Sequence, residues 1–261
     1  MSLLKEKLKG KLSKKDFDKL PSSFDVIGDI AIVEIRNLKG KDKLIADAIL
    51  KNVNNVKVVA KKSGIHTGRY RTQKLKIIGG EKRKETVHVE SGVRMKLDVE
   101  KCYFSPRLSE ERLRISRLVK KNEKILVMFS GISVYPLVIS RNSKAKEIYG
   151  VEINPSAHKY GLENVCMNKA RNVHLIKGNV TTTLPKLKEK FDRIIMAYPK
   201  FAHKYLNLAK KYLKKGGVIH FYTFSHEDDF TKLKKKYNVK RLFKCGAYAP
   251  RVYRVCLDLK F

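Results

Sequence analysis

The chain has 261 residues, of which 43% are hydrophobic, so it is long enough for one large domain or two and too apolar for a disordered protein. Its 59 Lys and Arg against 25 Asp and Glu leave a formal net charge of +34, which is typical of proteins that bind nucleic acid. The alternative is the Lys-rich surface of a heat-adapted protein, but heat adaptation usually raises Glu along with Lys, and here Glu does not keep pace.

The first part of the chain predicts a basic helix followed by a small α+β domain. Residues 2–20 alternate Lys with Leu at near-helical spacing and end at Pro21, so residues 1–21 are expected to form a basic N-terminal helix. From Phe24 the pattern changes to strands, with Gly28 as a bend. The expected elements of residues 22–103 are one helix at 42–51 and strands at 26–35, 56–60, 74–78, 86–90 and 94–98.

The second part, residues 104–261, alternates strands with helices. Ile125–Phe129 is apolar and continuous, as expected of a strand that is buried on both faces. Further strands are expected at 148–153, 173–176, 193–197 and 218–224, with helices at 134–140, 156–168 and 201–214. This alternation predicts a doubly wound α/β domain with a parallel sheet. The last two strands, 242–248 and 251–259, predict a hairpin that gives the sheet an antiparallel edge.

Residues at the ends of three predicted strands indicate a nucleoside site. In an open α/β sheet, ligands bind beyond the carboxyl ends of the strands. The first strand ends in Phe129-Ser130-Gly131, where a single Gly allows a tight turn, and Glu152 ends the second, where a carboxylate can accept both ribose hydroxyls. Asn179 ends the third strand, where an amide can read an adenine edge. Alternatively, Glu152 is a surface residue at a strand end, and Asn179 is a simple turn residue. Together these residues fit adenosine without a pyrophosphate cradle, which favours S-adenosylmethionine over NAD.

A helix is expected to enter this second part of the chain. Ser105 is a good N-cap, and it is followed by proline at the first helical position. Arg112 falls on the apolar face of this helix, where a cation needs a partner. That partner is either a core carboxylate or the cofactor or a phosphate, unless the side chain extends outward to solvent. Arg107, in the first turn, is freer to face RNA.

The fourth strand ends in Met196-Ala197-Tyr198-Pro199. Methyltransferases that act on base nitrogens often carry Asn or Asp followed by two residues ending in Pro here, and the polar side chain holds the target nitrogen. We expect Met196 to occupy that polar position. Tyr198 either stacks on a base or caps the sheet.

Several classes of protein are excluded by what the sequence lacks. The longest uncharged run, Ile125 to Ser140, is too short to span a bilayer, and Met1–Leu20 lacks the apolar centre of a signal peptide. The four Cys and seven His show no spacing typical of a metal site. We therefore expect a cytoplasmic protein with reduced thiols and no metal.

Four segments resemble a known family. "SFDVIGDIAIVEI", "ESGVRMKLDVEKCYFSPRLSEER", "VEINPSA" and "DRIIMAYP" are similar to the archaeal and eukaryotic enzymes that modify guanosine at tRNA position 37. The resemblance covers residues 22–261. One branch of this family is the tRNA guanine N1-methyltransferase. The other is the tRNA wybutosine-synthesizing protein 2 branch, which transfers the α-amino-α-carboxypropyl group of S-adenosylmethionine.

The resemblance favours the second branch. The methyltransferase branch carries Asn-Leu-Pro after the fourth strand, whereas this chain has Met-Ala-Tyr-Pro followed by Lys200 and His203. The resemblance implies a Rossmann-like class I S-adenosylmethionine-dependent transferase domain at 104–261 and a tRNA-binding α+β domain at 22–103. The implied activity is transfer to 4-demethylwyosine at position 37 of tRNA(Phe), with release of methylthioadenosine. The alternative activities are tRNA guanine-37 N1-methylation and RNA binding without catalysis.

The resemblance also implies roles for individual residues. Ser105 and Arg112 would contact the cofactor, Glu152 its ribose, and Asn179 with Val180 its adenine, while the loop from Phe129 to Gly131 would pass beneath it. The family often has Asp where Asn179 stands. For the substrate we expect contacts from the three residues Arg107, Tyr198 and Pro199. No side chain is assigned as a general base, so catalysis is expected from orientation. A monomer is expected.

Overall fold

The computed structural model describes residues 2–65, 67–239 and 241–261. They divide into two compact units, each described here by itself. The first unit comprises residues 1–89 and 95–106, and the second comprises 90–94 and 107–261. Residues 2–21 pack within the first unit, and residues 90–94, which include the turn of a hairpin, cluster with the second.

The first unit is built on a four-stranded sheet with the order β1-β2-β3-β4. Its strands are β1 (Asp25–Ile27), β2 (Ile30–Val33), β3 (Val58–Lys62) and β4 (Leu75–Gly80). Helix α3 (Asp42–Asn52) buries Ile45, Ala46 and Ile49 in the core of this unit, because these positions fall on one face at helical spacing. The strands β5 (Glu85–Glu90) and β6 (Val93–Asp98) form a separate two-stranded hairpin.

The basic N-terminal segment differs from its prediction. Instead of one helix, it forms the short helices α1 (Leu3–Lys7) and α2 (Lys14–Asp18). Between them Gly10 has a φ of 78°, a left-handed conformation that ends a right-handed helix. Leu4 and Leu8 are nevertheless buried in the core of the first unit, so the predicted apolar face is used in packing.

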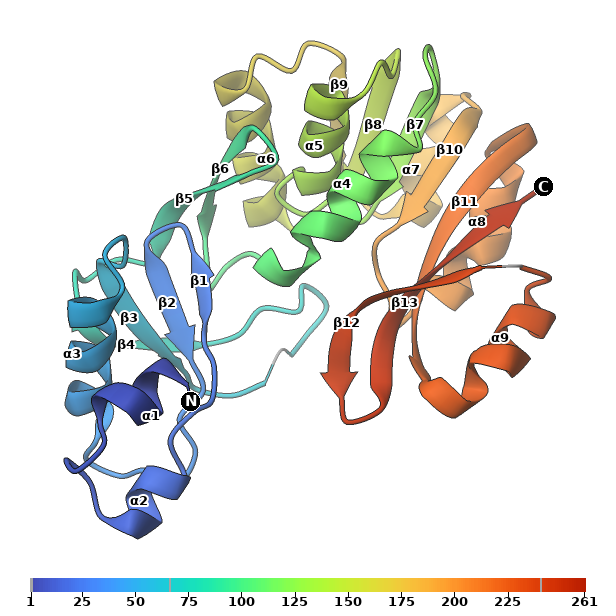
Figure 1. Ribbon diagram of the computed structural model, residues 1–261. Helices are drawn as coiled ribbons and strands as arrows, with labels where there is room; N and C mark the ends of the chain where they lie inside the picture. Colours follow the sequence, from blue (N-terminus) through green and yellow to red (C-terminus); the bar gives the residue numbers. More distant parts are fainter. Residues whose placement is uncertain (1, 66, 240) are drawn as a thin grey trace. The chain divides into compact units, whose positions relative to one another are not determined.

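The second unit contains a seven-stranded sheet with the order β12-β13-β11-β10-β7-β8-β9 (Figure 1). Its parallel strands are β7 (Lys124–Met128), β8 (Glu147–Glu152), β9 (Val173–Lys177), β10 (Phe191–Met196) and β11 (Leu213–His226). From β7 the chain continues to β8 and β9 on one side, and β10 and β11 are added on the other. Strand order therefore reverses between β7 and β10, which is where open α/β sheets bind ligands.

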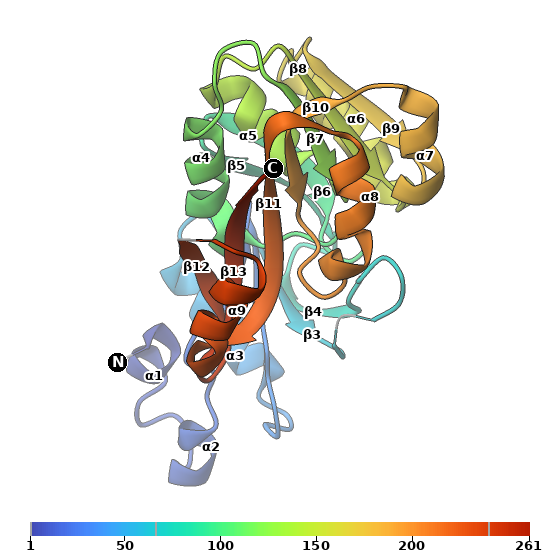
Figure 2. The same cartoon turned by 90° about the vertical axis from the view of Figure 1, so that its right-hand side faces the viewer.

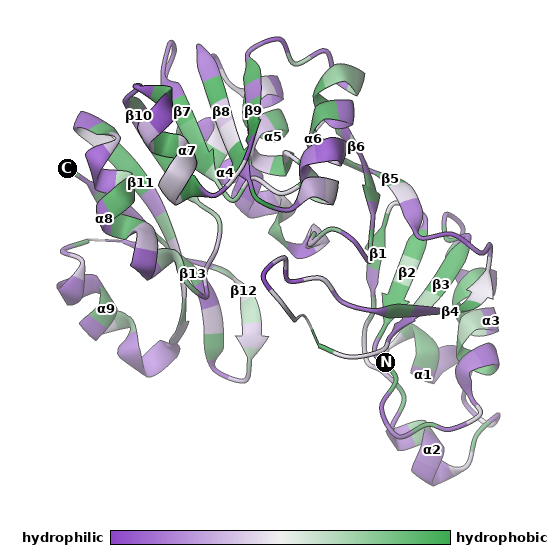
Figure 3. Ribbon diagram, turned by 180° about the vertical axis from the view of Figure 1, so that it is seen from behind, coloured by the Kyte–Doolittle hydropathy of each residue, from purple (hydrophilic) through white to green (hydrophobic). Residues whose placement is uncertain are grey.

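Helices cover both faces of this sheet (Figure 2). They are α4 (Ser109–Arg117), α5 (Val134–Asn142), α6 (Pro155–Met167), α7 (Val180–Leu187), α8 (Leu206–Lys211) and α9 (Phe230–Lys236), with 3-10 turns at Pro106–Leu108, Ala202–Tyr205 and Glu227–Asp229. The central strands are apolar, whereas α9 is strongly hydrophilic (Figure 3). The predicted α/β class with a Rossmann-like sheet is confirmed. Helix α7, which carries Pro185, had not been expected.

The sheet ends in the expected antiparallel hairpin. Strands β12 (Leu242–Ala249) and β13 (Val252–Lys260) pair with each other, and β13 pairs antiparallel with β11. Strand β11 is longer than the segment predicted from its sequence. Phe221 of β11 is opposite Met196, the last residue of β10, so β11 continues for five residues beyond the end of its neighbour.

Candidate functional site

The loop after β7 turns sharply at the carboxyl edge of the sheet. Phe129, Gly131 and Ser133 all have positive φ, at 64°, 58° and 74°. The Ser130 N–H donates to the Val151 carbonyl of β8 at 3.0 Å, which ties this turn to the neighbouring strand. Two non-glycine residues in the left-handed region are unusual in so short a loop and are typical of functional sites.

Glu152, the last residue of β8, holds this loop from the other side. Its Oε2 accepts from the Gly131 N–H and its Oε1 from the Asn154 N–H, both at 2.7 Å. The side chain is nearly buried, and burial raises the pKa of the carboxyl although these backbone donors oppose the rise. Each carboxylate oxygen has a second lone pair, so Glu152 can still accept hydrogen bonds from a diol.

Asn179 begins helix α7. Its side-chain oxygen accepts from the Thr181 N–H at 3.2 Å and so caps the helix. The sequence left open whether this residue is structural, and the cap gives it a structural role. Val180, next in the chain, is 2% exposed. The predicted adenine contact of Asn179 and Val180 stays a prediction.

Two serine hydroxyls next to the loop lack partners among the residues that the structure describes. Ser130 Oγ and Ser133 Oγ are both buried and make no hydrogen bond. A buried hydroxyl without a partner costs free energy, so its presence is informative. Two such groups beside Gly131 fit a loop that receives a polar ligand.

Aromatic rings gather where β10 ends. The Phe129 ring lies 5.1 Å from those of Tyr198 and Tyr205, and the Tyr198 ring lies 5.4 Å from that of Phe201. Lys200 Nζ and Lys204 Nζ lie over the Phe201 ring at 5.4 and 5.3 Å. The sequence analysis singled out Tyr198 but missed Phe201 and Tyr205. The signal that could have found them is their separation of four residues, which places two side chains on one face of a helix. This aromatic cluster offers faces for stacking and cations for phosphate.

The structure corrects the role expected for Met196. Its side chain is fully buried in the core of the sheet, so it cannot occupy the polar position at the strand end. Counting back two residues from Pro199, as in Asn-Leu-Pro, gives Ala197, which is half-buried. The Tyr198 N–H donates to the Met196 carbonyl at 2.8 Å, which closes a tight turn around Ala197. The strand end therefore carries a methyl group in place of a polar side chain.

Arg112 has a carboxylate partner. It forms a two-pronged ion pair with Glu90, with Arg112 Nε 2.5 Å from Glu90 Oε1, and both side chains are almost completely buried. The sequence left open whether the partner of Arg112 is a core carboxylate, the cofactor or a phosphate, and the structure provides a core carboxylate. The sequence analysis had not singled out Glu90, which directly precedes the Ser91-Gly92 turn. The geometry gives Arg112 a structural partner, and its contact with the cofactor stays a prediction.

Ser105 and Arg107 lie on either side of the boundary between the units. Ser105 belongs to the first unit, whereas Arg107 is exposed in the 3-10 turn that begins the continuous part of the second. The N-cap of α4 is Leu108 and not Ser105, because the chain makes this 3-10 turn before the α-helix starts at Ser109. The binding roles predicted for Ser105 and Arg107 stay predictions.

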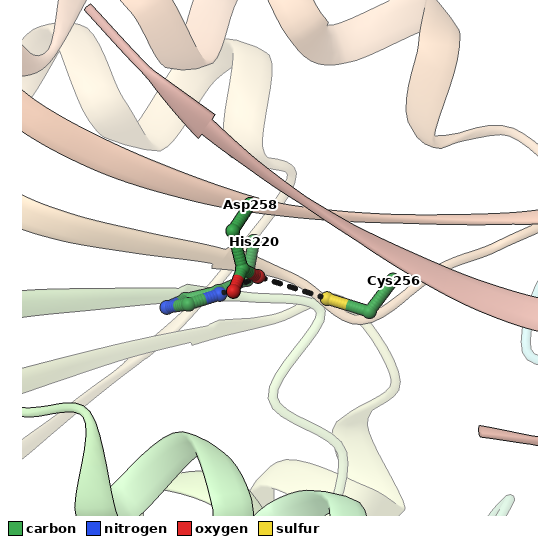
Figure 4. Close-up of side chains that lie close together, drawn as sticks. All are labelled: His220, Cys256 and Asp258. Carbon is green, nitrogen blue, oxygen red and sulfur yellow. Dashed lines mark hydrogen bonds and ion pairs between the residues drawn. The ribbon is translucent and has the colours of Figure 1, made fainter. Parts of the chain in front are cut away.

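A buried polar cluster lies within the sheet, away from the strand ends. His220, Cys256 and Asp258 have potential metal-ligating atoms within 4.8 Å of one another (Figure 4). His220 Nδ1 is 2.7 Å from Asp258 Oδ1, and its Nε2 is 2.6 Å from Arg193 Nη1, which can only donate. Burial lowers the pKa of His220, which is consistent with a neutral ring that donates to Asp258. Hydrogen bonds thus account for this cluster, and the expected lack of a metal site stays a prediction.

Helix α4 contributes a further buried carboxylate, Glu111, which the sequence analysis did not single out. Glu111 accepts from the Tyr222 hydroxyl at 2.5 Å and forms an ion pair with Arg114, at 2.7 Å from its Nε. Tyr135 of α5 donates in turn to Tyr222, at 3.1 Å. These contacts fasten α4 and α5 to β11.

Comparison with known proteins agrees with this architecture. A family model described as the TRM5/TYW2 methyltransferase domain matches residues 86–247, and one described as the TYW2 N-terminal domain matches residues 4–83. The chain is 41% identical over 256 residues to the tRNA (guanine(37)-N(1))-methyltransferase Trm5b of Pyrococcus abyssi, covering 92% of this chain and 75% of the relative. It is 34% identical over 255 residues to the tRNA(Phe) (4-demethylwyosine(37)-C(7)) aminocarboxypropyltransferase of Methanocaldococcus jannaschii, covering 91% and 97%.

The solved structures that resemble this chain include both kinds of enzyme. The structure of aTrm5 with tRNALeu superposes with a TM-score of 0.88 at 34% identity, over 100% of this chain and 78% of that chain. The structure of M. jannaschii TYW2 with AdoMet superposes with a TM-score of 0.68 at 28% identity, over 91% and 98%. Within the described residues, no helix is long and apolar enough to cross a membrane.

Proposed function

This chain belongs to the TRM5/TYW2 methyltransferase family, and we propose that it transfers the α-amino-α-carboxypropyl group of S-adenosylmethionine to 4-demethylwyosine at position 37 of tRNA(Phe). Methylthioadenosine is the by-product of this reaction in the biosynthesis of wyosine derivatives. At the coarser level the chain is an S-adenosylmethionine-dependent tRNA-modifying transferase.

The strand ends of the second unit fit the cofactor. In the proposal, Glu152 holds the ribose hydroxyls, the loop from Phe129 to Gly131 passes beneath the nucleoside, and Asn179 with Val180 meets the adenine. The buried carboxylate of Glu152 and the partnerless hydroxyls of Ser130 and Ser133 support this assignment. S-adenosylmethionine supplies three electrophilic carbons on one sulfonium sulfur. The protein selects the transferred group by which carbon it turns toward the acceptor.

The observation that carries the proposal is Ala197. A polar side chain directly after β10 is well placed to hydrogen-bond the ring N–H of guanine and to hold it for attack on the methyl group. Ala197 has no such group, whereas the rings of Phe129, Tyr198 and Tyr205 beside it offer apolar surface. These features suit a larger, tricyclic base that is held by stacking rather than by a side-chain hydrogen bond. Bond formation at its carbon releases the proton of that carbon to solvent, because no side chain is assigned as a general base.

Transfer of a methyl group to guanosine 37 is the second candidate. The 41% identity to Trm5b, a tRNA (guanine(37)-N(1))-methyltransferase, favours it. Against it stands the match of residues 4–83 to the TYW2 N-terminal domain, together with Ala197.

The two candidates differ in which atoms leave the cofactor, so position-specific labels separate them. The protein is incubated with tRNA(Phe) carrying either guanosine or 4-demethylwyosine at position 37, and with cofactor labelled in the methyl group or in the carboxyl carbon. We expect only the carboxyl label to enter the RNA, only with 4-demethylwyosine, and methylthioadenosine to accumulate in equal amount. Entry of the methyl label, with S-adenosylhomocysteine as by-product, would contradict the proposal.

Further parts of the proposal follow the sequence. We place the enzyme in the cytoplasm as a monomer without a metal ion, and assign no side chain as a general base. Arg107, Tyr198 and Pro199 are proposed contacts for the RNA. The Lys-rich segments 204–215 and 232–240, of which residue 240 lies outside the described residues, are proposed to bind phosphate.

A further inference from the structure

Three strands of the second unit continue beyond the edge at which the cofactor residues lie. Beyond Phe221, strand β11 has no partner in β10, but it stays paired with β13 as far as His226 opposite Val252. Strand β12 pairs with β13 up to Ala249 opposite Val252. Residues 222–226 and 246–254 therefore form a three-stranded projection, here called the arm, which extends past the end of β10 (Figure 1).

The arm carries an aromatic platform made by Phe224 and Tyr248. Their ring centroids are 4.3 Å apart at an interplanar angle of 33°, so the two rings are in close, tilted contact. Phe224 is half-buried, whereas Tyr248 is 65% exposed. Arg254 is opposite Phe224 in the strand register, and its guanidinium lies over the Phe224 ring at 5.7 Å. The platform thus presents one open aromatic face with a cation beside it.

The strand alternation places this platform on the face covered by α4. Side chains two residues apart in a strand point to the same side, so Phe224 shares its side with Tyr222. The Tyr222 hydroxyl donates to Glu111 in the first turn of α4. The platform therefore adjoins the start of α4, on the same edge of the sheet as Glu152 and Tyr198.

The C-terminal segment that carries Tyr248 and Arg254 is strongly basic, as suits a polyanionic partner. Residues 227–261 contain ten Lys and Arg against four Asp and Glu. Two of those acids, Glu227 and Asp228, are already paired with Arg251 at 2.6 Å, in the turn next to Tyr248. An exposed ring with cations around it is the combination that binds unpaired nucleotides in single-stranded RNA.

We propose that the platform of Phe224 and Tyr248 is a second nucleotide site, at which an unpaired base of the RNA outside position 37 stacks on Tyr248 and Arg254 meets its phosphate. This inference rests on RNA being the substrate. It does not depend on which group is transferred. The site increases RNA affinity and contributes nothing to cofactor binding.

The absence of tryptophan from the chain gives a direct test. A Tyr248→Trp variant carries a single fluorophore on the platform, and its emission is followed during titration with tRNA, with single-stranded RNA and with a duplex RNA of equal length. We expect quenching by tRNA and by single-stranded RNA, but not by the duplex, because only an unpaired base can stack on the ring. Quenching by the duplex as strong as that by single-stranded RNA would overturn the proposal, because stacking on an unpaired base would not then explain it. Quenching by no RNA would also overturn it and would leave a protein-binding surface as the alternative.

A Phe261→Trp variant is the matched control. Phe261 is also an exposed aromatic residue with a lysine over its ring, Lys210 at 4.5 Å. Phe261 follows β13 at the opposite edge of the sheet from the arm. Lys260, the last residue of β13, pairs with Val218, which lies near the start of β11. Lys210 lies in a segment that is proposed to bind phosphate, so this variant reports phosphate contact without stacking, and its emission should change much less than that of Tyr248→Trp when RNA is added. Equal quenching of both variants would show non-specific contact and would also overturn the site.

Affinity gives a second readout. At one fixed salt concentration, Tyr248→Ala should weaken tRNA binding by about fivefold or more, Tyr248→Phe should keep most of the affinity, and Phe261→Ala should change it little. Cofactor affinity should stay the same in all three variants, which also shows that they fold. An unchanged tRNA affinity of Tyr248→Ala would count against the site, while failure of aminocarboxypropyl transfer alone would leave it standing.

Discussion

At the scale of single residues, Glu152 is the group whose environment most clearly differs from that of a surface carboxylate. It is 9% exposed and is held by backbone N–H groups of Gly131 and Asn154. A protein that only needed a strand terminus here would gain by using an uncharged residue, because burying a carboxylate is costly. The cost is understandable if the carboxylate accepts hydrogen bonds from a ligand.

The raised pKa of Glu152 leads to a prediction about pH. Burial raises the pKa above its ordinary 4.5, so the proton is bound at a higher pH than on a free carboxyl. Since only the ionised form accepts hydrogen bonds at both oxygens, affinity for S-adenosylmethionine should fall as the pH falls through the raised pKa. The same shift has the opposite sign for folding: its contribution to stability is full below pH 4.5 and is lost as the pH rises through the folded-state pKa. Calorimetric titration of the cofactor across acidic to neutral pH measures the first effect.

A Glu152→Gln variant serves as the control for that titration. It should bind S-adenosylmethionine about 10- to 100-fold more weakly at neutral pH, and the acid-side dependence should disappear. An undiminished pH dependence in the variant would assign the titration to another group.

Arg112 shows how a correct inference about burial can leave a function open. The helical periodicity placed its guanidinium on the packed side, and the side chain is 2% exposed. Its neighbour in space, Glu90, is 22 residues away in the sequence, so no local pattern could identify it. Breaking such a pair by removing one partner is strongly destabilising, because an uncompensated charge stays buried.

At the scale of elements, the turn between β1 and β2 shows how glycine sets a strand pairing. Gly28 has a φ of 57°, its N–H donates to His88 Nδ1 at 3.1 Å, and the next N–H, of Asp29, donates to Thr86 Oγ1 at 3.2 Å. A Cβ at this position would lie 2.6 Å from the Val87 carbonyl oxygen. The turn therefore packs directly on β5, and only a residue without a side chain fits.

A Gly28→Ala substitution should therefore destabilise the first unit, and Gly40→Ala provides a matched control. Gly40 also has a positive φ, 70°, but no atom lies within 4 Å of a Cβ built there. The control should lower the free energy of unfolding by about 1–2 kcal/mol through backbone strain alone. Gly28→Ala should lower it by a further ~1–3 kcal/mol, because the added methyl group meets backbone that cannot move away. Urea denaturation followed by circular dichroism measures both, and equal losses would contradict the packing argument.

At the scale of the whole molecule, the net charge of +34 dominates how the protein meets its substrate. Lysines outnumber their acidic partners on helices such as α9, whose last turn carries Lys234, Lys235 and Lys236. Neutralising phosphates releases counterions, so binding to RNA becomes dependent on salt.

The affinity for tRNA should accordingly fall steeply with salt. If six or more phosphates are contacted, raising monovalent salt from about 50 to about 200 mM should weaken binding by about 10³-fold or more. Filter binding at several salt concentrations gives the slope, and cofactor affinity measured over the same range serves as the control. A slope near zero would mean that the charge serves stability or solubility and not RNA binding.

Much of the fold was accessible from the sequence because its signals are local. Continuous apolar runs such as Ile125–Phe129 mark strands buried on both faces, and their alternation with helices required a parallel sheet. Helix α7 was missed because a short segment with three threonines and Pro185 has weak helical propensity. The N-terminal segment was predicted as one helix because its leucine spacing continues across Gly10, whose backbone conformation interrupts the helix.

For the candidate site too, some features could be read from the sequence and others required the tertiary structure. The sequence by itself determined the residue types at the strand ends, including Glu152, Gly131 and Tyr198, since each lies at or shortly after the end of a recognisable strand. Only the tertiary structure decided which side chains meet: Arg112 with Glu90, Phe129 with Tyr205, and Phe224 with Tyr248. It also showed that Ala197, the first residue after β10, and not Met196, occupies the position at which the methyltransferases carry a polar side chain. The physical reason is that strand and helix patterns depend on neighbours along the chain, whereas pairing depends on the register and order of strands that are distant in sequence.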